Sequence, residues 1–264
     1  MQVKEHLNFS KYKRFFAFGC SFTNYKWPGW PEIIAQYIPE SYNLGIAASD
    51  NRLIYLRVLD ADCVYNFNKD DLVIVMFTNH WRDTYFHKTK PFELVKVMDE
   101  DLVFNEVNFV FRDYCFFKSV WHLLEHKNVD YDLLSMSGYT IDLYKKHSID
   151  PKNLEKSAQI ENMQQYFHNP LSLFKPSMFE ICYDCNWSNP SIKFARQEGS
   201  LVDNHPTPSM ALTYMKTIYK ENSFDLCQDY INHYESLVVG NEIPARLHPQ
   251  YEFKSILKHH PLSY

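Results

Sequence analysis

Several features that would place this chain in a particular class are missing from its sequence. No apolar run reaches the roughly 18 residues that a membrane-spanning helix needs. The first ten residues contain no apolar segment of the kind found in a secretory signal, so we expect a cytoplasmic protein. The net charge is −5 and no basic stripe with interleaved aromatic residues occurs, which argues against nucleic acid as a partner.

Motifs for phosphates and metals are also lacking. Neither Gly-x-x-x-x-Gly-Lys nor Gly-x-Gly-x-x-Gly occurs near the first predicted strand, which argues against a nucleotide-handling enzyme on a similar sheet. The six cysteines are scattered, and the single C-x-x-C, Cys182 and Cys185, has no second pair or nearby histidine that would complete a zinc site. We therefore expect no metal and no bound cofactor, and interpret the Cys182/Cys185 pair as small buried hydrophobes rather than as a zinc or redox site.

The first 80 residues show the alternation of a doubly wound α/β protein. Apolar runs predict strands at 15–18 and 72–77, and a short strand is expected at 42–45. Apolar residues at helical spacing predict helices between these strands, over about 31–38 and 51–59. Because the run at 72–77 does not alternate, it is typical of a parallel strand covered on both faces.

The remainder of the chain is harder to interpret, but nothing in it divides the 264 residues into two domains. We expect residues 87–175 to form a mainly helical insertion or lid, with one clear helix over 113–125. A further strand is predicted at 178–182, and helices after Pro208 and over 224–234. Residues 240–264 are interpreted as a solvated C-terminal extension.

Small or polar residues follow each of the three predicted strands. Ser21 comes after the first strand, Gly45 ends the second, and Asn79 follows the third. In a parallel sheet these three strand ends lie at one edge, where open α/β sheets bind their ligands. Our hypothesis is that Ser21 is a nucleophile; the alternative is that it merely caps the next element.

A serine nucleophile needs a base, which is usually a histidine oriented by a carboxylate. Asp203 and His205 lie in a proline-rich turn just before a predicted helix. Acyl transfer also needs donors for the developing oxyanion. The backbone N–H of Gly45 and the side chain of Asn79 are candidates, because both are expected at the strand ends beside Ser21.

Taken in order, these residues give the chain its resemblance to the SGNH (GDSL-type) hydrolase superfamily. The segments are Gly19-Cys20-Ser21-Phe22-Thr23, Asn43-Leu44-Gly45, Thr78-Asn79 and Asp203-Asn204-His205. The resemblance covers residues 15–83 and 201–220. It implies a three-layer α/β/α fold with a mainly parallel, flavodoxin-like sheet. It also implies a triad of Ser21, Asp203 and His205, with oxyanion donors from the Ser21 and Gly45 backbone and from Asn79.

The chain departs from the family pattern at three places. Cys20 stands where the family usually has Asp, and Phe77 where it usually has Gly. The family's usual Asp-x-x-His spacing is one residue shorter in this chain, as Asp203-Asn204-His205. This difference bears on the role of Asp203 more than on that of His205. A backbone carbonyl or another carboxylate is therefore an alternative partner for the imidazole.

The resemblance implies acyl transfer through an acyl-serine, most often of acetyl groups on carbohydrates. The Gly-Cys-Ser-Phe-Thr start is similar to members of bacterial surface-polysaccharide gene clusters, such as those for capsules. Resolution by water would make the protein an esterase; resolution by a sugar hydroxyl would make it an O-acetyltransferase, with acetyl-coenzyme A as the co-substrate to consider. The residues expected to contact a small acyl ester or glycan are Trp27, His80, Trp81 and Arg82.

Two other interpretations stay open. The fold can serve as a non-catalytic glycan-binding or assembly module, in which the departures reflect loss of activity. A thiol enzyme that uses Cys20 is the other. The sequence leaves the acyl donor, the acceptor and the oligomeric state open.

Overall fold

A four-stranded parallel sheet forms the centre of the protein in the computed structural model. The structure describes residues 8–79, 82–85, 93–96, 106–137, 173–183, 205–220 and 222–239. The sheet has the order β2-β1-β3-β6. Its strands are β1 (Arg14–Phe18), β2 (Glu40–Asn43), β3 (Asp71–Phe77) and β6 (Asp130–Ser135). All three neighbouring pairs are parallel, so the expected flavodoxin-like order is confirmed.

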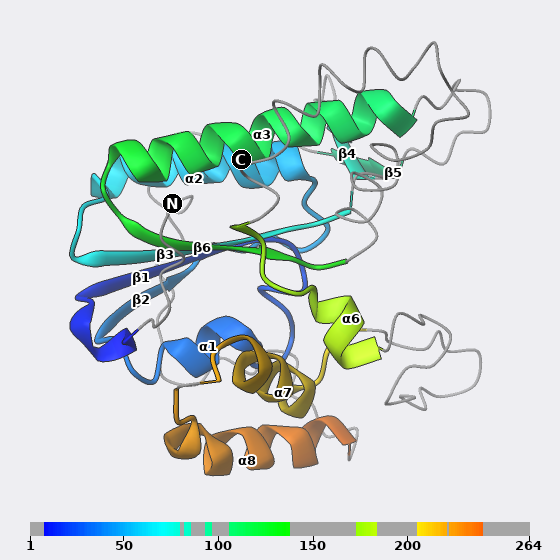
Figure 1. Cartoon of the computed structure of the whole chain (residues 1–264). Helices are drawn as coiled ribbons and strands as arrows, with labels where there is room; N and C mark the ends of the chain where they lie inside the picture. Colours follow the sequence, from blue (N-terminus) through cyan, green and yellow to red (C-terminus); the bar gives the residue numbers. More distant parts are fainter. Residues whose placement is uncertain are drawn as a thin grey trace, which may run out of the picture.

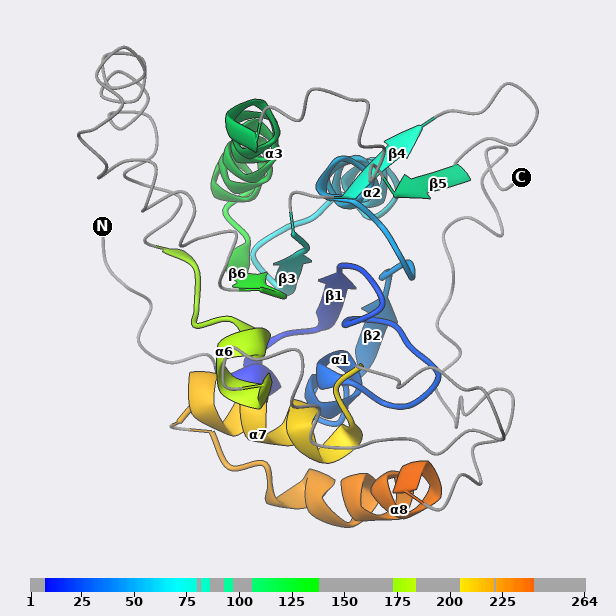
Figure 2. The ribbon, with the colours of Figure 1, turned by 90° about the vertical axis from the view of Figure 1, so that its right-hand side faces the viewer.

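Helices cover both faces of this sheet, which gives the expected three layers (Figure 1). One face is covered by α2 (Asn51–Tyr65) and α3 (Glu106–His126). The other is covered by α1 (Trp30–Ile34), α6 (Met178–Tyr183) and α7 (Pro208–Ile218), with α8 (Gln228–Val239) outside α7, as Figure 2 also shows. Short 3-10 turns span Phe9–Lys11 and Asp225–Cys227. Among the helices described, none is both long and apolar enough to cross a membrane.

The central strand β3 shows why the sheet must be covered on both sides. All seven of its residues are buried. Leu72, Ile74 and Met76 belong to the apolar cluster on the α1/α7 side. Val73, Val75 and Phe77 belong to the cluster under α2 and α3. Successive side chains of a strand point to opposite faces, so an unbroken apolar run supplies both cores at once.

Part of the stretch expected to be a helical insertion belongs to the central fold instead. Helix α3 packs against α2, and β6 pairs with β3 from Leu72↔Asp130 to Phe77↔Ser135. Leu133 and Leu134, which lie within the stretch expected to be mainly helical, are therefore in a strand. A separate antiparallel pair, β4 (Arg82–Tyr85) and β5 (Glu93–Lys96), lies next to α2. Most of the remaining residues of 87–175, and all of 240–264, lie outside the described part of the chain.

The strand predicted at 178–182 is wrong, because these residues form helix α6. The backbone N–H and hydroxyl of Ser177 both donate to Glu180 Oε2, at 2.7 and 2.8 Å. The Glu180 N–H donates back to Ser177 Oγ at 3.1 Å. This Ser-x-x-Glu capping box stabilises a helix start, and its pattern is present in the sequence.

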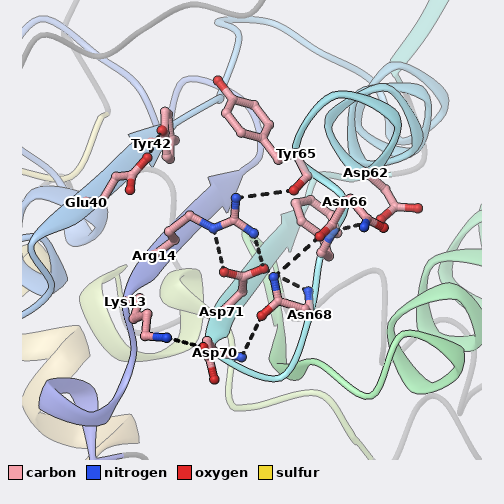
Figure 3. Close-up of polar contacts among 11 residues, drawn as sticks. Lys13, Arg14, Glu40, Tyr42, Asp62, Tyr65, Asn66, Asn68, Asp70 and Asp71 are labelled. Atoms are coloured by element: carbon pink, nitrogen blue, oxygen red, sulfur yellow. Dashed lines mark hydrogen bonds and ion pairs between the residues drawn. The ribbon is translucent and has the colours of Figure 1, made fainter.

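An ion pair joins the two central strands at the edge opposite their carboxyl ends (Figure 3). Arg14 donates from Nε and Nη2 to the two carboxylate oxygens of Asp71, each at 2.7 Å. Arg14 Nη1 also donates to the carbonyl of Tyr65 at the end of α2. Asp71 is fully buried, and a bidentate guanidinium is the partner that best satisfies a buried carboxylate. The pair fixes the register of β1 on β3 at that edge.

Candidate active site

Ser21 lies in a tight turn directly after β1. The carbonyl of Cys20 accepts hydrogen bonds from the N–H groups of Thr23, at 2.9 Å, and Asn24, at 3.0 Å. The Ser21 side chain is largely buried, and within the described residues its own N–H donates no hydrogen bond. The turn therefore presents a hydroxyl and a backbone N–H together at the carboxyl edge of the sheet.

Gly19 makes this turn possible. A Cβ at that position would overlap the Thr23 hydroxyl and would lie 2.9 Å from the carbonyl oxygen of Met76 on β3. The absence of a side chain thus lets β1 and the turn after it approach the neighbouring strand closely.

His205 is brought to Ser21 from the far end of the chain. Its Nε2 lies 2.8 Å from Ser21 Oγ, which is hydrogen-bonding distance. His205 stands just before Pro206 and before Thr207, whose side chain caps α7 by accepting from the Met210 N–H. The packing of α7 against α1 therefore sets the position of the imidazole. Asp203 lies outside the described residues, so its expected partnership with His205 stays a prediction.

Gly45 does not offer the oxyanion donor that the sequence suggested. Its N–H donates to the side-chain Oδ1 of Asn43 at 3.1 Å, and its carbonyl accepts from Asn24 Nδ2 at 2.9 Å. A Cβ on Gly45 would lie 3.0 Å from side-chain atoms of Thr23 and Asn24. The glycine is needed here for close packing of the β2 end against the Ser21 turn, and its donor is already used.

Asn79 reaches the same sheet edge as Ser21. Phe18 of β1 pairs with Val75 of β3. Ser21 follows Phe18 by three residues and Asn79 follows Val75 by four, so both lie just beyond the ends of neighbouring strands. The Oδ1 of Asn79 is buried and has no hydrogen-bond partner among the described residues. Buried polar atoms without partners are rare in folded proteins, and active sites are one place where they occur.

Of the four residues expected to contact substrate, the structure describes two. Trp27 is only 4% exposed, and its Nε1–H donates to the carbonyl of Pro206 at 2.7 Å. It is therefore a buried structural residue, which corrects the expectation that it contacts a glycan. Arg82 begins β4, and its Nη1 lies 3.5 Å from the carbonyl of Ser49 in the loop after β2. His80 and Trp81 lie outside the described residues.

A buried polar network under the Ser21 turn was not among the sequence expectations. Asn43 Nδ2 donates to the carbonyl of Thr23 and to Glu32 Oε1, both at 2.8 Å. Glu32 also accepts from the N–H of Gly29 at 2.8 Å. Burial raises the pKa of the Glu32 carboxyl, and these hydrogen bonds oppose the rise. The network holds β2, α1 and the Ser21 turn together. The signal for it is Glu32 three residues after Gly29, at the start of a predicted helix.

No group of three or more histidine, cysteine, aspartate or glutamate side chains with the geometry of a metal site occurs among the residues that the structure describes. Cys20 is fully buried, and its Sγ contacts Met136 Sδ at 3.7 Å. The described structure thus places the hydroxyl of Ser21 against a histidine at the sheet edge.

Solved structures with some likeness to this chain include three enzymes or family members from microbes. A Bacteroides fragilis protein assigned as an acylhydrolase is 14% identical, with a TM-score of 0.39 over 84% of this chain and 87% of its own. A Veillonella parvula member of the lipolytic G-D-S-L family is 11% identical, with a TM-score of 0.40 over 77% and 96%. A gut microbial diltiazem-metabolizing enzyme is 14% identical, with a TM-score of 0.40 over 80% and 46%. No family model and no curated protein matches the chain.

At these identities and TM-scores, the chemistry of the site is inferred from the chain's own residues. The arrangement of Ser21 and His205 suits proton transfer from the hydroxyl to Nε2. The N–H of Ser21 and the amide of Asn79 stand at the same sheet edge, where a developing oxyanion would lie.

Proposed function

We propose that the protein is a serine-dependent acyl-ester hydrolase or O-acyltransferase. The observation that carries the proposal is the 2.8 Å contact between Ser21 Oγ and His205 Nε2. A serine hydroxyl is weakly nucleophilic on its own, and a histidine at this distance is the usual means of activating it.

In the proposed reaction, Ser21 Oγ attacks the acyl carbonyl carbon while its proton passes to His205 Nε2. The carbonyl oxygen becomes an oxyanion, stabilised by the Ser21 N–H and by Asn79 Nδ2. The tetrahedral intermediate collapses to an acyl-serine, and the leaving oxygen takes the proton from His205. A water or sugar hydroxyl then attacks the acyl-serine, with His205 again accepting the proton. The second tetrahedral intermediate collapses, the bond from the acyl carbon to Ser21 Oγ breaks, and Oγ takes the proton back from His205. Asp203 is proposed to orient the imidazole.

For the substrate, we propose acetyl transfer or removal on a carbohydrate, such as a bacterial surface polysaccharide, in the cytoplasm. This part rests on the resemblance in the sequence, and acetyl-coenzyme A is the proposed co-substrate if the enzyme is a transferase. Of the residues expected to contact substrate, Arg82, which carries a cation near the loop after β2, remains a candidate for an anionic glycan. His80 and Trp81 remain candidates from the sequence.

The competing function is a non-catalytic glycan-binding or assembly module. The occupied N–H of Gly45 favours it, because one expected oxyanion donor is missing from the site. The two functions differ in whether the Ser21 hydroxyl is activated.

The first prediction concerns this activation. A fluorophosphonate probe should label wild-type protein at Ser21, and hydrolysis of p-nitrophenyl acetate should fall by several orders of magnitude in Ser21→Ala and His205→Ala. The matched controls are Ser119→Ala and His122→Ala, two exposed positions on α3. Labelling is measured by peptide mass spectrometry and hydrolysis by release of p-nitrophenol, with and without added glycan.

The outcomes separate the candidate functions. Faster p-nitrophenol release with glycan, together with acetylated sugar in the mass spectrum, supports the transferase, and hydrolysis unaffected by glycan supports the esterase. If wild-type protein is not labelled, or if Ser21→Ala hydrolyses the ester as fast as wild type, the serine mechanism is wrong and the binding module is favoured.

A further inference from the structure

The imidazole of His205 is stacked on the ring of Tyr25. The two ring centroids lie 3.7 Å apart and the planes differ by 12°, which is full face-to-face contact. Phe22 approaches the same imidazole at 5.6 Å with a tilt of 51°. Neither aromatic residue has a role in the function proposed above.

Trp27 supports the stack of Tyr25 on His205. Its indole packs edge-on against Tyr25, with centroids 4.6 Å apart and planes at 83°. Its Nε1–H donates to the carbonyl of Pro206, the residue after His205. Val238 of α8 is fully buried in the same small apolar cluster. Tyr25 therefore rests on a buried support that is itself bonded to the backbone next to the histidine.

We call Phe22, Tyr25 and Trp27 the aromatic cradle. These three residues lie within six positions of Ser21, so one short segment carries the hydroxyl and also holds the imidazole. The backbone of His205 lies just before α7, 184 positions after Ser21 in the sequence. The cradle is thus the direct physical link between the two reacting groups, besides the Oγ···Nε2 contact itself.

We propose that Tyr25 is a positioning residue that fixes the plane of the His205 imidazole, and so aims Nε2 at Ser21 Oγ. The inference rests on the proposed function, which makes His205 the base. Rotation of the imidazole about its Cβ–Cγ bond would move Nε2 off the hydroxyl, and a ring stacked on its face opposes that rotation. The imidazole also gains positive charge when it takes the serine proton, and the face of an aromatic ring attracts positive charge.

The second prediction tests this role through the split between kcat and KM. Tyr25→Leu should lower kcat for p-nitrophenyl acetate by about 10- to 100-fold, the scale of a small misplacement of a catalytic group, with little change in KM. The rate of fluorophosphonate labelling should fall by the same factor. Tyr25→Phe keeps the ring face and should restore both rates close to wild type.

Two further variants keep the inference falsifiable. Tyr55→Leu removes a comparable ring stack, that of Tyr55 on Phe116 between α2 and α3, and controls for general loss of stability. If Tyr25→Leu does not fold, Trp27→Phe removes the Nε1–H donated to Pro206 and part of the buried indole, and keeps an aromatic ring under Tyr25. This variant should lower kcat by a smaller factor than Tyr25→Leu.

The failure of this inference is distinguishable from failure of the proposed function. If Ser21→Ala abolishes labelling and hydrolysis while Tyr25→Leu and Trp27→Phe match wild type, the positioning role is wrong and the serine mechanism stands. If Tyr25→Leu and Tyr55→Leu lower kcat equally, Tyr25 has only a structural role. If Ser21→Ala retains wild-type activity, the proposed function itself is wrong.

Discussion

Ala48 has a backbone conformation that is unfavourable for any residue with a side chain. Its φ is 65°, in the left-handed region, and it lies in the loop after β2. Two hydrogen bonds join this loop to the Ser21 turn. The Ile46 N–H donates to the carbonyl of Gly19, and Asn24 Nδ2 donates to the carbonyl of Gly45. Within the described residues the N–H of Ala48 donates no hydrogen bond. Strain of this kind gathers at functional sites, and here it lies in the loop that borders the proposed one.

The third prediction follows from that strain. Ala48→Gly should raise the free energy of unfolding by about 0.5–1 kcal/mol, because relief of about 1–2 kcal/mol of left-handed strain exceeds the added flexibility of the unfolded chain, about 0.4–1 kcal/mol. Urea denaturation gives the measurement. The neighbouring Ala47→Gly is the control and should lower stability, since Ala47 has no positive φ. Equal destabilisation by both variants would show that Ala48 is unstrained.

At the scale of elements, a buried polar cluster joins α2, β3 and α3 beside Asn79. Asn51, the first residue of α2, donates to the carbonyl of Thr78 at 3.0 Å and to Asp113 Oδ2 at 2.6 Å, and it accepts from the Thr78 N–H at 2.8 Å. Arg112 pairs with Asp113 at 2.9 Å. Burial raises the pKa of the Asp113 carboxyl to about 6, against the opposing effects of Arg112 and Asn51.

The fourth prediction uses this raised pKa. The folded protein binds the Asp113 proton more tightly than the unfolded chain, so the stabilising contribution is full below pH 4 and is lost as pH rises through about 6. In Asp113→Asn this loss is absent. The stability of the variant relative to wild type should therefore increase by about 2 kcal/mol between pH 4 and 7, most of the full difference that follows from about 1.4 kcal/mol per pKa unit.

Denaturant titrations at several pH values measure the difference. Leu124→Ala, a fully buried apolar residue of the same helix, is the control, and it should lose the same stability at every pH. Parallel curves for wild type and Asp113→Asn would contradict the prediction.

The elements also show what sequence patterns can and cannot give. β1 and β3 were predictable because an unbroken apolar run of four to eight residues between turn signals is typical of a buried strand. The start of α2 was predictable because Ser49 and Asp50 are both residue types that cap helices; in the structure Asp50 is the cap and accepts from the Leu53 N–H. β6 was missed because its outer half, Asp130–Asp132, is polar and only its inner half is buried. α6 was mistaken for a strand because short apolar runs carry no clear period.

The same limit applies to the site. Ser21 and His205 were predictable as candidates because each follows or precedes a recognisable element, and the structure places them in contact. The stack of Tyr25 on His205 could not be predicted, since it depends on where α7 docks. The use of the Gly45 N–H by Asn43 was equally hidden, because it is set by side-chain geometry within the loop.

At the scale of the whole molecule, two apolar cores lie on opposite faces of the sheet. Cysteines distinguish this interior from the surface: Cys20 and Cys227 are fully buried, while Cys63 and Cys115 are exposed. Cys182 is intermediate, and burial raises the pKa of its thiol to about 12, which lowers the reactive thiolate fraction.

The fifth prediction is a pattern of thiol modification. Iodoacetamide should label Cys63 and Cys115 in the native protein, and Cys20 and Cys227 only when denaturant opens the fold. Native labelling should leave ester hydrolysis intact, because the proposed nucleophile is a hydroxyl. Peptide mass spectrometry measures the labelled sites. Rapid native labelling of Cys20 with loss of activity would favour the thiol enzyme instead.

The contact between Ser21 and His205 spans 184 positions of the chain. As the chain is synthesised from its N-terminus, the serine and its aromatic cradle emerge long before the histidine that completes them. In the proposed mechanism, the Ser21 hydroxyl gains its base only when α7 has been added and packed against α1. Under that mechanism, reactivity toward acyl esters would therefore appear late in synthesis, after α7 has docked.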